Sequence, residues 1–344
     1  MTHADKSTRT VYDAQPRGLW LAILALLLML GTLPGAALPR ASAAGVERPV
    51  LAFYYPWYTK STWCSCTMSD LPATRYSSND VKVIDRQIAE ASRAGITGFI
   101  VSWWGKGSYE DSNFATMLDR VAAWNKKTGA HFVLAIHLED DGALFRTEAH
   151  IEQQLRYAMA SYTARSTYFH WQGKPVFFVW DAFGGGRTQT TWAAIRKQID
   201  PQHKTFWSLD TTEVTTLDDT FDAMHLFGAG YWGITQHYMM ALYQNFRAKV
   251  DAYNQAHGTQ KLWIAGVLPG YNDSQKPQPL VVPRDNGATY TLSWQAAIAS
   301  KPAWITISTF NEWYLGSTIE PSIHYGTQYL DLTKHFAADW RAQG

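Results

Sequence analysis

The chain has 344 residues and a formal net charge of +1, so its charge gives no reason to expect nucleic acid or another polyanion as a partner. Charged residues make up only 17% of it, below the roughly 25% of an ordinary soluble domain, whereas aromatic residues reach 14% and include 16 tryptophans. This balance favours a neutral ligand with flat apolar faces, such as a carbohydrate, although a large aromatic core would use many of the same residues.

The N-terminal segment predicts export. Leu19–Leu38 is almost uninterruptedly apolar, Arg17 precedes it, and the small residues Ala41–Ala44 follow it. This is the layout of a secretory signal peptide with an Ala-x-Ala cleavage site. About 20 apolar residues can also just span a bilayer, so an uncleaved anchor is the alternative. We expect residues 1–44 to be this leader and residues 45–344 to be one exported domain, secreted or anchored and facing outward, with no other membrane contact.

Strand-like and helix-like segments alternate after the leader. Short runs rich in β-branched and aromatic residues predict strands at 50–58, 96–104, 131–139, 175–183, 205–211, 223–231, 262–269 and 304–310. Amphipathic patterns predict helices at 81–94, 112–128, 148–161, 190–199, 236–257, 293–299 and 325–340. Asn79 or Asp80 can cap the first of these helices, and Gly95 follows its end.

Eight strands in this alternation predict an α/β fold, a single (β/α)8 TIM-type barrel. A doubly wound open sheet is the alternative, but its Gly-x-Gly-x-x-Gly turn does not follow the first strand. Nor does the chain contain a Gly-x-Ser-x-Gly elbow, so an esterase or protease has little support.

The two cysteines, Cys64 and Cys66, are separated by one residue. Export would permit a disulfide, but a bridge across one residue departs from normal geometry. A zinc site normally has four ligands, and no nearby histidine completes one here. We interpret the pair as a local loop feature and predict neither a metal nor a cofactor.

The predicted strands end in polar or aromatic side chains, and a barrel builds its site from the carboxyl ends of its strands. The last strand breaks into a polar loop at Asn311-Glu312-Trp313-Tyr314, where a carboxylate lies among aromatic rings that can hold a sugar. The same reasoning makes several other side chains near these strand ends candidates for substrate contact, namely Tyr54, Tyr55, Trp57, Trp103, Trp104, Asp181, Tyr231 and Tyr271.

The third strand carries His137 and Glu139 on one face, because alternate residues of a strand share a face. The two could bind one metal ion if Asp181 supplied a third ligand. Hydrogen bonding to a sugar is the interpretation that we favour.

Seven segments match one known family in their order, their spacing and their amino-acid sequence. They are Phe53–Tyr58, Ala94–Gly105, Gly173–Val176, Pro269–Tyr271, Arg284–Gly287, Phe310–Trp313 and Ile319–Pro321. They resemble glycoside hydrolase family 99, the endo-α-mannosidases and endo-α-mannanases, over most of the chain after the leader. The resemblance implies a (β/α)8 barrel without a metal, an α-linked oligo- or polysaccharide substrate, and substrate contacts from Arg284, Asn311 and Trp313.

The final motif of that family reads Asn-Glu-Trp-x-Glu-Gly. The resemblance implies that its first carboxylate acts as a base on the 2-hydroxyl of the substrate, and its second as acid/base on the glycosidic oxygen. By position the first is Glu312, whereas the second falls on Leu315, which cannot exchange a proton.

Glycoside hydrolysis generally needs two carboxyl groups, so another strand end must then supply the acid. We predict Glu139, which His137 could orient, ahead of Asp181, Asp210, Asp273 and Glu320. The expected protein is a secreted glycosidase with Glu312 and Glu139 as catalytic residues. The alternative is a carbohydrate-binding pseudoenzyme on the same barrel.

Overall fold

The computed structural model describes residues 48–139, 147–227 and 236–343. The predicted leader and Tyr231 lie outside the described residues. Within those three ranges, no helix is both long and apolar enough to cross a membrane.

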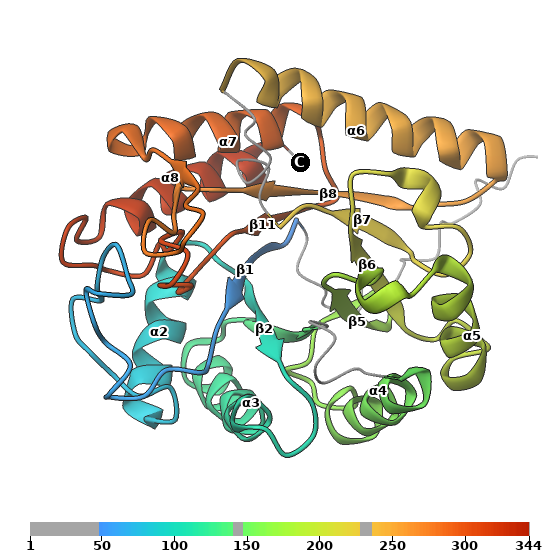
Figure 1. Ribbon diagram of the computed structural model, residues 1–344, viewed down its shortest axis with the longest axis horizontal. Helices are drawn as coiled ribbons and strands as arrows, with labels where there is room; N and C mark the ends of the chain where they lie inside the picture. Colours follow the sequence, from blue (N-terminus) through green and yellow to red (C-terminus); the bar gives the residue numbers. More distant parts are fainter. Residues whose placement is uncertain (1–47, 140–146, 228–235, 344) are drawn as a thin grey trace, which may run out of the picture. The chain divides into compact units, whose positions relative to one another are not determined.

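In the described part of the chain, eight parallel strands close into a barrel (Figure 1). Neighbours pair in the order β3-β2-β1-β11-β8-β7-β6-β5, and pairing of β3 with β5 closes the ring. The strands are β1 (Val50–Tyr54), β2 (Gly98–Trp103), β3 (Val133–Leu138), β5 (Lys174–Val179), β6 (Phe206–Asp210), β7 (Ala223–His225), β8 (Leu262–Val267) and β11 (Trp304–Ile307). The predicted (β/α)8 fold is confirmed, and the observed strands end before their predicted carboxyl ends.

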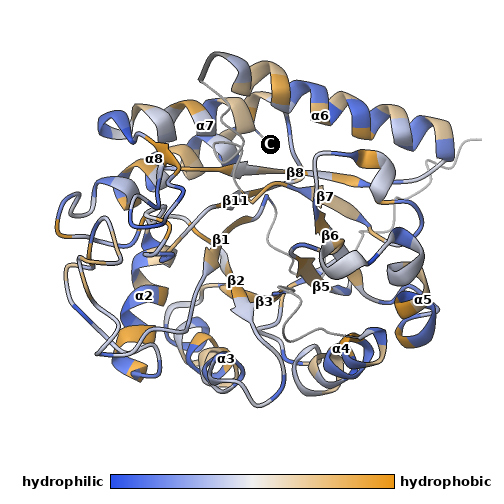
Figure 2. Ribbon diagram, in the orientation of Figure 1, coloured by the Kyte–Doolittle hydropathy of each residue, from blue (hydrophilic) through white to orange (hydrophobic). Residues whose placement is uncertain are grey.

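The helices lie around the outside of this ring (Figure 1). They are α2 (Val81–Arg93), α3 (Tyr109–Thr128), α4 (Glu148–Tyr162), α5 (Gln189–Ile199), α6 (Gln236–His257), α7 (Ala288–Ala299) and α8 (Gln328–Ala342). Hydrophilic and hydrophobic residues alternate along them, as expected for helices with one face on the barrel (Figure 2).

Local signals explain where α2 begins and ends. The Asp80 side chain accepts a hydrogen bond from the Lys82 N–H at 2.9 Å, which satisfies one of the free donors of the first turn. Gly95 follows the helix with φ of +81°, a conformation that favours glycine. A Cβ at this position would also come within 3.0 Å of the Ala337 Cβ on α8.

Several short elements were not predicted from the sequence. They are β4 (His170–Trp171), antiparallel to β5, the hairpin of β9 (Tyr271–Asn272) and β10 (Val281–Val282), and the 3₁₀ turns Gly184–Gly186, Val214–Thr216 and Asp285–Gly287. In the loop between β1 and α2, Cys64 and Cys66 form a disulfide with a Cα–Cα distance of 5.1 Å.

Alternate residues of β1 belong to two different layers of the core. Leu51, Phe53 and the following Tyr55 point into the barrel, where the Phe53 ring contacts the His137 ring at a centroid distance of 4.9 Å. Ala52 and Tyr54 point outward and pack in the layer between the barrel and the helices. This alternation decides which aromatic residues of β1 can reach the mouth of the barrel.

Candidate active site

A cavity of about 340 Å³ lies at the carboxyl ends of the barrel strands. Its volume falls within the range of small-molecule sites. The residues that line it follow six of the strands and come from segments far apart in the sequence: Tyr55, Trp57, Glu139, Trp180, Phe227, Tyr271, Lys276, Glu312, Tyr314 and Leu315. Aromatic rings therefore form much of the wall, and two carboxyl groups belong to it.

Glu312 is held by the loop that follows β11. The Asn311 side chain accepts from the Tyr55 N–H at 2.7 Å and donates to the Tyr55 carbonyl at 3.0 Å, so it ties this loop to the end of β1. The Glu312 N–H donates to Thr309 Oγ1 at 2.8 Å. Its carboxylate accepts from the Tyr314 N–H at 3.0 Å, and the residue is only 1% exposed.

Burial raises the pKa of Glu312 to about 8, and the negative charge of Glu139 adds to the increase. The N–H groups of Tyr314 and Leu315, together with the Lys276 ammonium, oppose it. Burial and the neighbouring Glu139 thus favour the protonated form of Glu312.

Glu139 follows β3 and is 8% exposed. Its Oε1 lies 3.1 Å from His137 Nδ1, which is the contact predicted from their alternation on the strand. The His137 ring is itself packed against Phe53 and stacked with Phe227, at centroid distances of 4.9 and 6.4 Å. The Glu139 carboxylate is thus oriented by a residue of the barrel interior.

Among the described residues, the other acids that we considered do not line this cavity. Asp181 is exposed. Asp210 accepts from the Phe227 N–H at 3.1 Å, and burial raises its pKa to about 6. Asp273 accepts from the Tyr271 hydroxyl at 3.0 Å and the Leu280 N–H at 2.5 Å, which fixes the β9–β10 hairpin. Glu320 is enclosed in a separate network.

Of the predicted substrate contacts, Tyr55, Trp57 and Tyr271 line the cavity. The Trp104 ring lies beside that of Trp57, with a centroid distance of 6.1 Å, and its Nε1 donates to Ser102. Tyr231 lies outside the described residues.

Four predicted contacts need correction, because Tyr54, Trp103, Asn311 and Trp313 are fully buried and do not line this cavity. Tyr54 points outward from β1, and its hydroxyl donates to Gln87 at 2.6 Å. Trp103 Nε1 donates to Asp111 at 2.9 Å. Asn311 bonds the Tyr55 backbone and Trp313 Nε1 donates to Glu320, so both side chains stabilise the loop around Glu312.

Arg284 and Asp181, which we also predicted as substrate contacts, do not line this cavity. The Arg284 guanidinium donates to the carbonyls of Gly316 and Thr318 at 3.0 and 2.8 Å, and lies over the Tyr325 ring. It lines a neighbouring cavity of about 270 Å³. Its hydrogen bonds also stabilise the end of the loop that follows β11, residues 308–321, which we call the motif loop.

Three lining residues were absent from our predicted site: Trp180, Phe227 and Lys276. Trp180 precedes the predicted contact Asp181 near the end of a strand, so its position could have indicated its role. Tyr314, which we named among the rings beside Glu312, does line the cavity. Phe227 was missed because we extended its strand to residue 231, whereas β7 ends at His225. Lys276 was missed because it lies in the turn between β9 and β10, a hairpin that we did not predict.

Leu315 lies in the wall of the cavity with Glu312, where it offers only an aliphatic surface. Within the described ranges, no group of three or more histidine, cysteine or acidic side chains could hold a metal ion. In this arrangement, two carboxyl groups could exchange protons with a ligand that the aromatic rings hold in the cavity.

Residues 64–341 match the sequence model of glycosyl hydrolase family 99. The glycoprotein endo-alpha-1,2-mannosidase of Mus musculus is 24% identical over 288 residues, covering 76% of this chain and 58% of the relative. A glycoprotein endo-alpha-1,2-mannosidase-like protein of the same species is 23% identical over 296 residues, covering 76% and 63%. The chain thus spans less than two thirds of the length of these relatives.

Among solved structures, the GH99 endo-alpha-mannosidase from Bacteroides thetaiotaomicron superposes with a TM-score of 0.71 at 24% identity. The match covers 85% of this chain and 97% of that structure. This likeness independently supports the barrel fold.

Proposed function

Because the chain belongs to glycosyl hydrolase family 99, we propose that it hydrolyses an α-linked, mannose-containing glycan at internal linkages. Relatives named as endo-α-1,2-mannosidases support this class of substrate. The observation that carries the proposal is that Glu139 lines the same cavity as Glu312, so a second carboxyl group is available although residue 315 is leucine.

The electrostatics of the cavity favour Glu312 as the proton donor. Its pKa of about 8 favours its protonated form, and the charge of Glu139 contributes to that value. Environments that separate the proton affinities of two carboxyl groups assign their roles as acid and base.

The proposed reaction uses Glu312 as the acid and Glu139 as the base. Glu312 gives its proton to the glycosidic oxygen as the bond from that oxygen to the anomeric carbon breaks. The Glu139 carboxylate stabilises the positive charge that develops on the sugar and takes a proton from the attacking water, whose oxygen bonds to the anomeric carbon. Solvent then returns the two groups to their starting states. This division of roles is the reverse of the one that the family motif implies, and it also reverses our sequence prediction, in which Glu139 supplies the acid.

The aromatic wall supports sugar binding next to these groups. Trp57 lies in the cavity with its ring 4.6 Å from that of Tyr55 and 6.1 Å from that of Trp104, measured between centroids. Trp180 and Phe227 contribute further faces, with their rings 5.1 Å apart. Such surfaces remove the apolar faces of a pyranose from water and leave its hydroxyls free to bind polar groups.

Export remains part of the proposal. Residues 1–44 would form the leader and residues 45–344 the catalytic domain, secreted or held at the outer face of the membrane. Mass spectrometry of the protein from its native host tests this, with cleavage near Ala44 as the expected result. An intact N-terminus in the membrane fraction would favour the anchor, and one in the cytosol would contradict export.

Activity is tested by incubating the purified protein with α-mannan and other α-linked glycans and separating the products by chromatography. Release of oligosaccharides from an α-mannose-containing glycan is expected. The Glu312→Gln and Glu139→Gln variants serve as controls for contaminating glycosidases, and both should be far slower. Binding of a glycan without hydrolysis would contradict the proposal and support the carbohydrate-binding alternative, which the leucine at residue 315 favours.

A further inference from the structure

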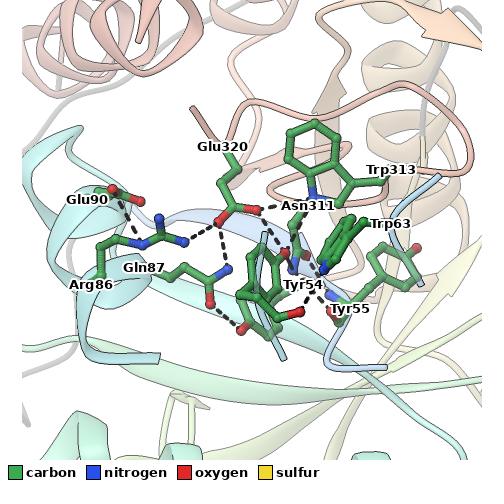
Figure 3. Close-up of polar contacts among 10 residues, drawn as sticks. Tyr54, Tyr55, Trp63, Arg86, Gln87, Glu90, Asn311, Trp313 and Glu320 are labelled. Atoms are coloured by element: carbon green, nitrogen blue, oxygen red, sulfur yellow. Dashed lines mark hydrogen bonds and ion pairs between the residues drawn. The ribbon is translucent and has the colours of Figure 1, made fainter. Parts of the chain in front are cut away.

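Glu320 is a buried carboxylate for which the proposed reaction has no use. It lies eight residues after Glu312 in the loop that follows β11, and it is 3% exposed. Figure 3 shows its carboxyl group surrounded by hydrogen-bond donors. They are the Tyr76 hydroxyl at 2.9 Å and Trp313 Nε1 at 3.2 Å on Oε2, and Gln87 Nε2 at 2.7 Å and Arg86 Nη2 at 3.0 Å on Oε1.

The donors come from three different parts of the fold. Gln87 and Arg86 belong to α2, which is capped at Asp80 and packed against the barrel. Trp313 belongs to the motif loop, and Tyr76 to the segment between β1 and α2. The carboxylate therefore connects the loop that carries Glu312 to a helix.

The same network reaches both neighbours of Glu312. The Tyr76 hydroxyl donates to Glu320 and accepts from Asn311 Nδ2 and Trp313 Nε1, each at 3.3 Å. The Glu320 N–H also donates to the Phe310 carbonyl at 2.8 Å. Glu312 thus lies between two residues whose side chains are held by the pair of Glu320 and Tyr76.

A carboxylate is the side chain that this position requires. It accepts hydrogen bonds through both oxygens and carries no hydrogen of its own, so it can serve four donors at once. An amide of the same shape would turn an NH₂ group toward two of those donors. The close contacts on both oxygens leave no orientation of a glutamine that avoids this conflict.

We propose that Glu320 is a positioning residue of the active site, which holds the Glu312 carboxyl in the cavity by fixing Trp313, Tyr76 and Asn311 against α2. Its kinetic consequence rests on the proposed hydrolysis. A displacement of about 1 Å at a reacting group can lower the rate about 100-fold, so loss of this anchor should act on turnover more than on binding.

The kinetic test compares Glu320→Gln with Asp200→Asn. Asp200 is also 3% exposed and accepts from the Lys204 N–H and the Thr205 N–H at 2.7 and 3.0 Å, but it precedes β6 at the opposite end of the barrel. Glu320→Gln should lower kcat by about 10- to 100-fold with KM changed less than about threefold, and should shift the limb of the pH profile that Glu312 governs. Asp200→Asn should lower Tm but leave kcat and the pH profile unchanged.

Tyr76→Phe removes the shared hydroxyl and keeps the ring, so it provides a second variant should Glu320→Gln fail to fold. It should change kcat and the pH profile in the same direction. Wild-type kcat and pH profile in either variant would overturn the proposal. Equal loss of kcat in Asp200→Asn would also overturn it, because general destabilisation would then explain the effect.

Crystal structures of the wild type and of Glu320→Gln, or of Tyr76→Phe if needed, give a readout that does not depend on activity. The Asn311–Tyr55 and Glu312–Tyr314 hydrogen bonds should be broken or lengthened in the variant, while the barrel strands superpose. Unchanged contacts would overturn the positioning role. If the wild type hydrolyses no glycan, the proposed function fails, and these structures still decide whether Glu320 positions Glu312.

Discussion

Replacing Glu312 with glutamine should change how the stability of the protein depends on pH. The pKa of Glu312 rises from the ordinary value of 4.5 to about 8, chiefly because the carboxyl is buried. Between these two values the folded state keeps a proton that the unfolded chain releases, so rising pH lowers the free energy of unfolding. The full effect is about 5 kcal/mol, of which about 4 kcal/mol develops between pH 5 and pH 9. Glutamine does not ionise and removes this dependence.

Chemical denaturation of the wild type and Glu312→Gln at pH 5, 7 and 9 measures the effect. The variant should gain about 4 kcal/mol in free energy of unfolding relative to the wild type between pH 5 and pH 9. Asp251→Asn is the control, because Asp251 is largely exposed and pairs with Arg247 on the surface of α6. A difference between wild type and Glu312→Gln that stays constant within about 1 kcal/mol over this range would refute the reasoning.

Three further substitutions test other parts of the account. Leu315→Glu should raise the rate of glycan hydrolysis less than about tenfold if Glu139 already supplies the second carboxyl group. Activity in this variant together with none in the wild type would favour the carbohydrate-binding pseudoenzyme. Trp57→Ala should weaken glycan binding about tenfold in calorimetry, as expected for loss of about 1.4 kcal/mol of ring contact, and an unchanged Kd would exclude Trp57 from binding. Asp80→Ala should lower the free energy of unfolding by about 1 kcal/mol because the N-cap is lost, whereas an equal loss in Asn79→Ala would contradict this.

The barrel could be predicted from the sequence because each of its strands is a short apolar run, and all but β6 are followed by a helical pattern before the next barrel strand. The predicted ends were less accurate, since aromatic residues continue beyond the hydrogen-bonded ladder. The run Phe53–Tyr58 reads as one strand, yet β1 ends at Tyr54 and the next residues turn into the cavity wall. The same effect displaced the end of β7 and hid Phe227.

Side-chain direction was the other source of error. Tyr54 and Tyr55 are adjacent and chemically alike, but one points to α2 and the other lines the cavity. A period of two residues separates the faces of a strand, and only the packing of the whole barrel determines which face is inside. Glu139 lies in the cavity wall beside His137, as its place at a strand end suggested, whereas its catalytic role stays a prediction. The networks of Glu320 and Arg284 depend on contacts between distant segments, which no local pattern contains.

The proposed reaction divides the acid and base roles between Glu312 and Glu139, with Glu312 as the proton donor. It is tested most directly by assaying Glu312→Gln and Glu139→Gln on the natural glycan and on an aryl glycoside, whose leaving group needs little protonation. Loss of the acid should slow hydrolysis of the glycan by about 10²- to 10⁴-fold in Glu312→Gln while the aryl glycoside is far less affected, and Glu139→Gln should slow both. The opposite pattern, with the aryl glycoside spared only in Glu139→Gln, would contradict the account.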